Sequence, residues 1–432
     1  MIIQSVEIKG FWGRQTASTK INKDVTIFIG ENGTGKTTFV NSISAVLNVD
    51  FYQLARLSFD EIVIKLTDIN NKNTKTIKVI NDSKNNIPIN HYEYKISRKS
   101  YDLVVDMPIF SRATRVLNDN RLLYGRMHRS YRDQYIELKK ELHNIVEVSE
   151  ISVYRHSYNW ENENDSIQSL SAVDERLKKL LSGLSSYQLK LETKLNEISN
   201  DFQQKTLLSL LYSEDFDKFE REKIENQYST LEEQKNKIHK AFEELGIKDK
   251  KHDIDKHIEK IKTGIEGLRV ENSQNENTDD VFAIPLFYRT NHILDLLNKS
   301  EKEKNKITEA RDNFFKILND FVTRKKIIYE KNTSELSFYI LENQNEYFPW
   351  NQLSSGEKQL LIQFLEALLQ EKRNVIFIAD EPELSLHVKW QEKLINAIRK
   401  LNPNAQLIIA THSPDIVADY RDKVIDMEDI VH

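Results

Sequence analysis

The segment GENGTGKT, residues 30–37, places glycine, lysine and threonine in the pattern G-x-x-x-x-G-K-[S/T]. Backbone N–H groups can surround a polyphosphate only where no side chain blocks their approach, and glycine adopts the dihedral angles that such a loop requires. A helix that begins near Lys36 directs its positive end at the same anion. Lys36 would then reach the β- and γ-phosphates of a nucleotide, and the Thr37 hydroxyl would ligate Mg²⁺. The expected nucleotide-binding residues are Gly30, Asn32, Gly33, Gly35, Lys36, Thr37 and Thr38.

The alternative for this segment is a glycine-rich turn that only caps a helix. The apolar segment DVTIFIG precedes the turn and predicts a buried strand, and helical spacing follows over Lys36–Leu47. Strand, loop and helix in this order are the context that a phosphate-binding loop requires. We therefore predict a phosphate-binding loop.

A second candidate for chemistry is NVIFIADEPE, residues 374–383, in which an apolar run leads to Asp380 and Glu381. Two carboxylates at the carboxyl end of a buried strand lie where ligands bind in open parallel sheets. Asp380 would support the Mg²⁺ coordination shell, and Glu381 would polarise an attacking water as a general base. The alternative is an ordinary exit from a strand into a loop, which the phosphate-binding loop makes less attractive.

Two further segments are candidates for function because they occur together with the first two. In QLSSGEKQLLIQFLEAL, residues 352–368, Ser354 and Gly356 precede an amphipathic helix and offer donors at its N-terminus. The simpler alternative there is an N-cap with a nearby glutamate. In LIIATHSPDI, residues 407–416, His412 follows a buried strand, and a single histidine in that place is more often structural than functional.

The elements that must position these residues fall into three parts. Alternating segments near the N-terminus predict an antiparallel sheet beside the first strand, and two apolar strands near the C-terminus flank a helix and predict a parallel sheet with both faces covered. Between them, long amphipathic patterns rich in Glu and Lys predict helices, interrupted by a strand-like segment at 150–158. The charged faces of these helices are most simply explained as solvated surface. The predicted parts are 1–113, 114–326 and 327–432.

Composition limits the classes of function. The formal net charge of −5 argues against a generally basic protein that coats nucleic acid, and the absence of cysteine excludes disulfides, thiolate zinc sites and a cysteine nucleophile. The first ten residues have the alternation of a strand rather than a signal peptide, and no apolar run approaches the length of a membrane span. We expect a soluble, cytoplasmic protein.

The four segments occur in the order in which ABC-type ATPases carry the Walker A, signature, Walker B and switch-histidine motifs, and the chain resembles that superfamily. The resemblance implies an α/β head with a mixed sheet and an antiparallel β subdomain, ATP and Mg²⁺ as cofactors, and two copies that pair head to tail around ATP. It implies that His412 contacts the γ-phosphate. The residues that would complete the partner's site in trans are Ser354, Ser355, Gly356 and Glu357.

Two positions depart from the superfamily pattern. The D-loop position that often carries aspartate is His387, in the segment LSLH, which leaves communication between the two sites open. The glutamine of the usual Q-loop has no obvious place, and Gln53 is a candidate by rough order alone.

Spacing separates the branches of the superfamily. Lys36 and Ser354 are 318 positions apart, whereas the resemblance implies roughly a hundred in transporter subunits, so a transporter role is not expected. A long helical insertion resembles the RecF/SMC/OLD branch, and the motifs look especially like OLD-type ATPases. Only about twenty residues follow His412, so we expect no C-terminal Toprim nuclease domain. This arrangement resembles stand-alone ATPase subunits of two-gene anti-phage systems of the PARIS and Septu types, which implies a separately encoded nuclease effector.

Other functions remain open from the sequence. A RecF-like ATPase of DNA repair or recombination would clamp duplex DNA and would need several Lys and Arg contacts to phosphates. The arginine-rich stretch Arg112–Arg132 could serve DNA or a partner, although an exposed helix face with internal salt bridges explains it as well. A third alternative is a slow switch that binds ATP chiefly to dimerise. The trigger could be duplex DNA or a phage protein.

Overall fold

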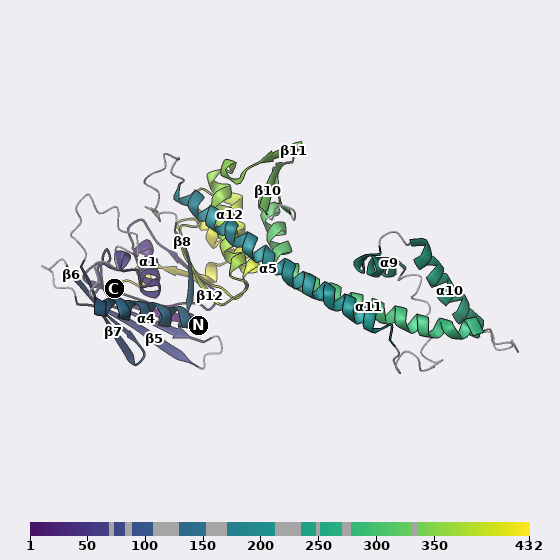
Figure 1. Cartoon of the computed structure of the whole chain (residues 1–432). Helices are drawn as coiled ribbons and strands as arrows, with labels where there is room; N and C mark the ends of the chain where they lie inside the picture. Colours follow the sequence, from purple (N-terminus) through teal and green to yellow (C-terminus); the bar gives the residue numbers. More distant parts are fainter. Residues whose placement is uncertain are drawn as a thin grey trace. The chain divides into compact units, whose positions relative to one another are not determined.

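The computed structural model of the chain describes residues 1–68, 73–82, 89–106, 129–152, 171–211, 235–247, 251–269, 278–330, 335–341 and 343–432 (Figure 1). These residues form two compact units. The head unit comprises Met1–Ser185 and Ala310–His432, and the helical unit comprises Ser186–Glu309. All four predicted motifs belong to the head unit, although they come from opposite ends of the chain.

A parallel sheet forms the centre of the head unit, with the strand order β14-β3-β13-β12-β8. Every neighbouring pair in it is parallel, so all carboxyl ends lie at one edge. The three middle strands consist almost entirely of buried residues, which explains their uninterrupted apolar sequences. The strands are β14 (Val424–Asp426), β3 (Val25–Ile29), β13 (Gln406–Ala410), β12 (Val375–Asp380) and β8 (Glu147–Ser152).

An antiparallel sheet of the order β2-β1-β4-β5-β6-β7 confirms the predicted sheet beside the first strand. Strand β4 shows why the sequence alternates, since Ile62, Ile64 and Leu66 are buried while Lys65 between them is exposed. The strands are β1 (Ile2–Phe11), β2 (Gln15–Lys20), β4 (Glu61–Thr67), β5 (Thr74–Asn81), β6 (Ile89–Ile96) and β7 (Lys99–Asp106).

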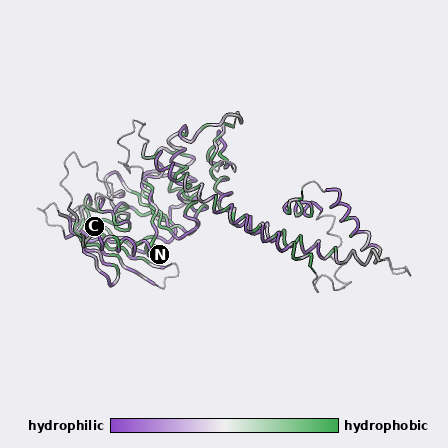
Figure 2. Tube along the Cα trace, in the orientation of Figure 1, coloured by the Kyte–Doolittle hydropathy of each residue, from purple (hydrophilic) through white to green (hydrophobic). Residues whose placement is uncertain are grey.

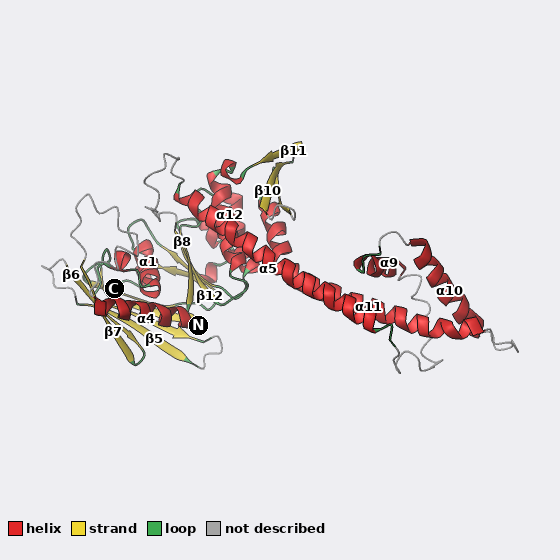
Figure 3. Cartoon of the chain, viewed as in Figure 1, coloured by secondary structure: helices red, strands yellow, loops and turns green. Residues whose placement is uncertain are grey.

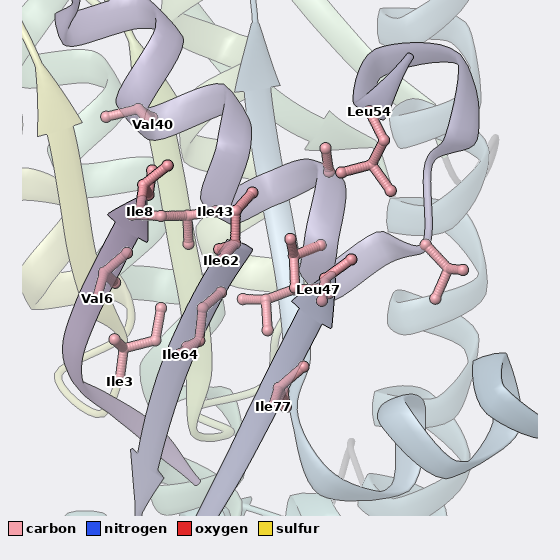
Figure 4. Packing of buried hydrophobic residues seen from close by; sticks show 14 of the residues in the cluster. Ile3, Val6, Ile8, Val40, Ile43, Leu47, Leu54, Ile62, Ile64 and Ile77 are labelled. Atoms are coloured by element: carbon pink, nitrogen blue, oxygen red, sulfur yellow. The ribbon is translucent and has the colours of Figure 1, made fainter. Parts of the chain in front are cut away.

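Helix α1 (Lys36–Asn48) packs against both sheets and joins them into one hydrophobic core. Figure 4 shows Val40, Ile43 and Leu47 of α1 facing isoleucines of the antiparallel sheet. Ile376, Ile378 and Ile408 of the parallel sheet belong to the same cluster. Each fully buried side chain of this kind contributes roughly 1.5–3 kcal/mol, so the core fixes the start of α1 relative to the carboxyl edge of the parallel sheet.

Shorter elements complete the head unit (Figure 3). A three-stranded antiparallel sheet, β11-β10-β9, precedes helix α12 (Ser355–Leu369), which carries the predicted signature at its start. The remaining elements are α2 (Phe51–Leu54), α4 (Arg129–Ile145), β9 (Lys325–Glu330), β10 (Glu335–Ile340), β11 (Asn343–Phe348), η3 (Trp350–Gln352), α13 (Val388–Leu401), α14 (Pro414–Val417), η4 (Arg421–Lys423) and η5 (Met427–Asp429).

The helical unit is built from parts of two long helices and two shorter ones. Along α5 and α11, hydrophobic and hydrophilic residues alternate in Figure 2, as expected of amphipathic helices. Small clusters around Ile261 and Phe287, and around Phe202 and Leu297, form its apolar interior. The helices are α5 (Ala172–Leu208), α9 (Lys235–Glu244), α10 (Lys251–Arg269) and α11 (Thr278–Phe321).

The chain is therefore an α/β head with an antiparallel β subdomain, split by a helical insertion, which confirms the predicted fold class. The central sheet was expected to be mixed, but all its described strand pairs are parallel. The helical unit has narrower bounds, 186–309, than the predicted insertion, 114–326. The reason is that β8 pairs with β12, and residues of α4 such as Leu138 join the core of the head. Most of the arginine-rich stretch Arg112–Arg132, and residues 153–158 of the strand-like segment, lie outside the described residues.

Candidate nucleotide-binding site

The predicted phosphate-binding loop connects β3 to the first turn of α1. Gly30, Gly33 and Gly35 all have positive φ, of 144°, 90° and 94°. Gly35 shows most directly why glycine is needed, because an added Cβ would lie 2.8 Å from ring atoms of both Phe11 and Trp12. The loop therefore combines a left-handed backbone with close packing, and both features exclude larger residues.

Lys36 is 5% exposed and its ammonium group lies inside the loop. Its Nζ donates hydrogen bonds to the carbonyl oxygens of Gly30, at 2.7 Å, and Glu31, at 2.9 Å. Burial lowers the pKa of Lys36, although Glu381 and Asp380 oppose this shift. A buried ammonium that bonds only to neutral carbonyls is suited to exchanging one of them for a negatively charged phosphate oxygen.

The remaining predicted nucleotide-binding residues lie in the turn or in the first turn of α1. Asn32 is exposed at the turn, and Thr38 is half-buried in the first turn of α1. Thr37 is exposed, and its Oγ1 donates to Asp380 Oδ1, at the carboxyl end of β12, at 3.0 Å. This contact joins two residues that are 343 positions apart.

Asp380 has the chemistry of a cation ligand. Burial raises its pKa to about 6; Thr37 opposes the shift by hydrogen bonding, and Glu381, Glu383 and Glu150 add to it. The negative charges gathered here favour a bound cation. A carboxylate beside a threonine hydroxyl supplies the hard oxygen donors that Mg²⁺ prefers, so the residues present fit this ion.

Among the described residues, no group of three or more His, Asp or Glu side chains could hold a metal ion by itself. Mg²⁺ in nucleotide sites takes one or two protein ligands, with water and phosphate oxygens as the rest. The pair of Thr37 and Asp380 is consistent with that mode of binding.

Glu381 and His412 come together at the same edge of the sheet. In the parallel pair of β12 and β13, Asp380 lies opposite Ala410. The backbone N–H of Glu381 donates to the Ala410 carbonyl at 2.8 Å. His412 Nε2 lies 3.9 Å from Glu381 Oε1, and their side chains are 39% and 30% exposed. A carboxylate and an imidazole that are both accessible to solvent can thus face one reactant.

The predicted signature residues begin α12. Ser354 is the N-cap and forms a capping box with Glu357, whose Oε2 accepts from the Ser354 backbone at 2.8 Å and from its hydroxyl at 2.9 Å. Lys325 also donates to this oxygen, at 2.9 Å. Ser355 is exposed beside them. The simpler N-cap interpretation from the sequence is therefore what the structure shows, and it leaves Ser354 and Ser355 accessible.

Gly356 has a packing role that the sequence did not indicate. A Cβ at this position would overlap the backbone carbonyl oxygen of Ser385. Ser385 has a left-handed φ of 68° and belongs to the loop between β12 and α13. The glycine lets the start of α12 touch this loop directly.

The two departures from the superfamily pattern have clear positions. His387 is the N-cap of α13, where its Nδ1 accepts from the Lys389 backbone at 3.2 Å. Gln53 lies in α2, beyond the C-terminal end of α1. Lys36 begins α1, a helix of 13 residues that rises about 20 Å, whereas Gln53 follows its other end.

Three residues near the site were missed from the sequence. Trp12 is 45% exposed at a left-handed φ of 54°, and its ring stacks on Phe11 beside Gly35. Glu383 binds the loop that carries His412. Glu150 of β8 accepts a hydrogen bond from Ser44 of α1. The second glutamate of DEPE was a visible signal for Glu383, whereas Trp12, in the turn after β1, and Glu150, in β8, become noticeable only in the folded structure.

The chain is similar in sequence to two curated proteins. The chain is 23% identical over 419 residues to the Retron Vc95 probable ATPase of Vibrio cholerae serotype O1 biovar El Tor, covering 92% of this chain and 67% of the relative. It is 28% identical over 128 residues to Septu protein PtuA of Bacillus thuringiensis, covering 26% of this chain and 32% of the relative. The predicted resemblance to ATPases of the Septu type is confirmed by this relative.

Solved structures similar to the chain include SMC heads. The Smc head domain of Pyrococcus furiosus with an extended coiled coil, bound to the C-terminal domain of ScpA, aligns with a TM-score of 0.43 and 14% identity, over 98% of this chain and 93% of that one. The SMC head domain from Thermotoga maritima aligns with a TM-score of 0.37 and 10% identity, over 97% of this chain and 92% of that one.

A family model described as AAA ATPase domain matches residues 1–417. This match includes the phosphate loop, the strand that ends at Asp380, and His412. The chain belongs to the AAA ATPase domain family.

Proposed function

We propose that the chain binds ATP with Mg²⁺ and hydrolyses it to ADP and phosphate in a site that two copies complete head to tail. The hydrogen bond of 3.0 Å between Thr37 and Asp380 carries this proposal, because it joins the phosphate loop to the carboxylate edge of the sheet. The family membership and the relative named as a probable ATPase support it.

The residues of one chain divide the binding of ATP among them. Backbone N–H groups of the loop and the ammonium of Lys36 would hold the phosphates, and Thr37 with Asp380 would hold Mg²⁺. When bound, Mg²⁺ neutralises charge that develops on the phosphate oxygens. Trp12 offers an exposed aromatic face beside Gly35 on which a base can stack.

Glu381 and His412 act on the reacting end of the nucleotide. Glu381 accepts a proton from the attacking water while the water oxygen bonds to the γ-phosphorus, opposite the bond to ADP that breaks. His412, whose Nε2 is 3.9 Å from Glu381 Oε1, donates a hydrogen bond to the γ-phosphate and orients the water through Glu381. ADP carries away the electron pair of the broken bond.

The signature residues serve the site of a second copy. Ser354 and Ser355 are exposed at the N-terminus of α12, a helix of 15 residues whose first N–H groups can bind an anion. Gly356 and Glu357 fix that start by packing and capping. The hydrogen bonds of Ser354 join it to Glu357 and Lys358 of its own helix, so the exposed side of Ser354 is available to the partner's ATP.

In the cell, the ATPase is proposed to act as a sensor or scaffold for a separate effector, most simply a nuclease, in defence against phage. The relationship to Septu protein PtuA supports this role. No helix among the described residues is long and apolar enough to cross a membrane.

The first experiment is ATP turnover by wild type and Glu381→Gln, with and without duplex DNA, across a salt series. Turnover that depends on Glu381 and is indifferent to DNA is expected for a scaffold that awaits a protein trigger. Turnover that rises with DNA and fades with salt would instead favour the RecF-like alternative. Equal turnover by both proteins would remove Glu381 as the base.

A further inference from the structure

Glu383, in the loop between β12 and α13, is bound to the loop that carries the switch histidine. Its Oε1 accepts the hydroxyl of Thr411, the backbone N–H of His412 at 3.1 Å and the backbone N–H of Ser413 at 3.3 Å. Its Oε2 is buried and has no hydrogen-bond partner among the described residues. One carboxylate oxygen therefore organises three consecutive residues of the neighbouring loop.

Gln391 of α13 also connects the Glu383 loop with the switch loop. Gln391 Nε2 donates to the carbonyl of Leu386 at 2.9 Å, and Gln391 Oε1 accepts from the hydroxyl of Ser413 at 2.7 Å. The two loops are thus joined at both ends, by Glu383 near Thr411 and by Gln391 near Ser413. Two cross-links of this kind restrict the position of the intervening backbone.

The loop that bears Glu383 is also fixed against α12. Gln363 is fully buried and its Nε2 donates to the Pro382 carbonyl at 2.7 Å, while Gly356 packs against Ser385. The backbone of the Glu383 loop is therefore held independently of the switch loop. It provides a rigid base from which the Glu383 carboxylate can place His412.

We propose that Glu383 is a positioning residue, whose carboxylate fixes the backbone of the switch loop so that His412 faces the same reactant as Glu381. This inference rests on the proposed function, in which Glu381 and His412 act on ATP. Displacing a reacting group by about 1 Å can cost roughly 100-fold in rate, so the backbone at residue 412 needs such a restraint. The exposed imidazole has few other contacts to supply it.

The test compares Glu383→Ala, Glu383→Gln and the control Glu392→Gln, which changes an exposed glutamate of α13. We expect Glu383→Ala to lower kcat roughly 10- to 100-fold while KM and ATP affinity stay within about twofold. Glu383→Gln retains an oxygen acceptor and should recover part of kcat. Glu392→Gln should match wild type.

Amide hydrogen exchange gives a readout that does not need turnover. In Glu383→Ala, the peptide containing His412 and Ser413 should exchange faster, whereas Glu381→Gln and Glu392→Gln should leave it unchanged. Unchanged kcat and exchange in Glu383→Ala would overturn the proposal. So would faster exchange throughout the head with KM and kcat altered together, which would indicate general destabilisation.

Failure of the underlying function is recognised separately. If wild type itself shows no turnover that depends on Glu381, the proposed ATPase mechanism fails, and the positioning role fails with it. If wild type is active and Glu383→Ala is equally active, only the role of Glu383 is wrong.

Discussion

The phosphate loop and the start of α12 differ in what their polar side chains contact. Thr37 reaches across the head to Asp380, and Lys36 is buried inside its own loop. Among the described residues, the Ser354 hydroxyl bonds only to Glu357, three residues away, and Ser354 remains exposed. One region is assembled by long-range packing within a single chain, whereas the other is a locally stabilised surface.

This difference separates residues that the core holds in place from residues that stay accessible on the surface. Residues that must be held close together before ATP arrives lie at the ends of buried parallel strands, where the core fixes them. In the proposed head-to-tail arrangement, Ser354 meets the ATP of another copy and has to stay accessible, so a capping box is sufficient to order it.

The largest effect is expected for Glu381→Gln. Loss of the general base should lower kcat by about 10²- to 10⁴-fold, while ATP affinity changes only a few-fold because Glu381 does not hold the phosphates. Steady-state turnover and equilibrium ATP binding measure the two quantities. A parallel loss of affinity would show that Glu381 belongs to the binding side of the site.

Lys36→Ala should act on binding instead. Removing a buried ammonium leaves phosphate charge uncompensated, and two charge-assisted hydrogen bonds of about 1.5–3 kcal/mol each make a loss of affinity of at least about 100-fold reasonable. Titration with ATP and Mg²⁺ measures it. Normal nucleotide affinity would contradict the assignment of the phosphate loop.

Ser354→Arg should abolish most turnover without affecting ATP binding by a single chain, because the new side chain obstructs only the partner's site. Roughly a tenfold or greater loss of kcat is expected, equivalent to about 1.4 kcal/mol or more. Mixing this variant with Lys36→Ala should restore activity, since one site of a mixed dimer then combines an intact loop with an intact signature. Normal turnover by monomeric Ser354→Arg would reject the head-to-tail arrangement.

The pH dependence of stability should reveal the charge gathered at the carboxylate edge. The pKa of Asp380 is raised to about 6, chiefly by burial, so between about pH 4 and 6 the folded state binds more protons than the unfolded state. Its contribution therefore favours folding at low pH and is lost as pH rises through this window, in the absence of Mg²⁺ and nucleotide. Asp380→Asn should remove about 2 kcal/mol of this dependence. Denaturant titrations from pH 4 to 8 would measure the free energy of unfolding at each pH. The same dependence of this free energy on pH in wild type and Asp380→Asn would contradict a raised pKa at Asp380.

The smallest effect is expected at Trp12. Stacking of a base on an aromatic ring contributes about 1–3 kcal/mol, and the lower figure suits a ring that is 45% exposed. Trp12→Ala should thus raise KM for ATP about fivefold and leave kcat nearly unchanged, while Trp12→Phe should stay close to wild type. An unchanged KM in Trp12→Ala would show that the base lies elsewhere.

The predicted parts of the fold differ in how well periodicity revealed them. The strands of the antiparallel sheet alternate visibly, and the buried parallel strands appear as short apolar runs, so both sheets were predictable. Strand β8 was harder to assign, because EVSEIS has a weak pattern and gains its place only by pairing with β12. The bounds of the insertion differ for the same reason, since they depend on contacts and not on local pattern.

The sequence by itself predicted a phosphate-binding loop, since the spacing of glycine, lysine and threonine over residues 30–37 is typical of such a loop. It also determined the order of the four motifs. The tertiary structure alone decided that Thr37 meets Asp380, that Glu383 holds the loop of His412, and that Gly356 admits the carbonyl of Ser385. The physical reason is that these contacts join residues from different elements, and only the packed core sets the distances between them.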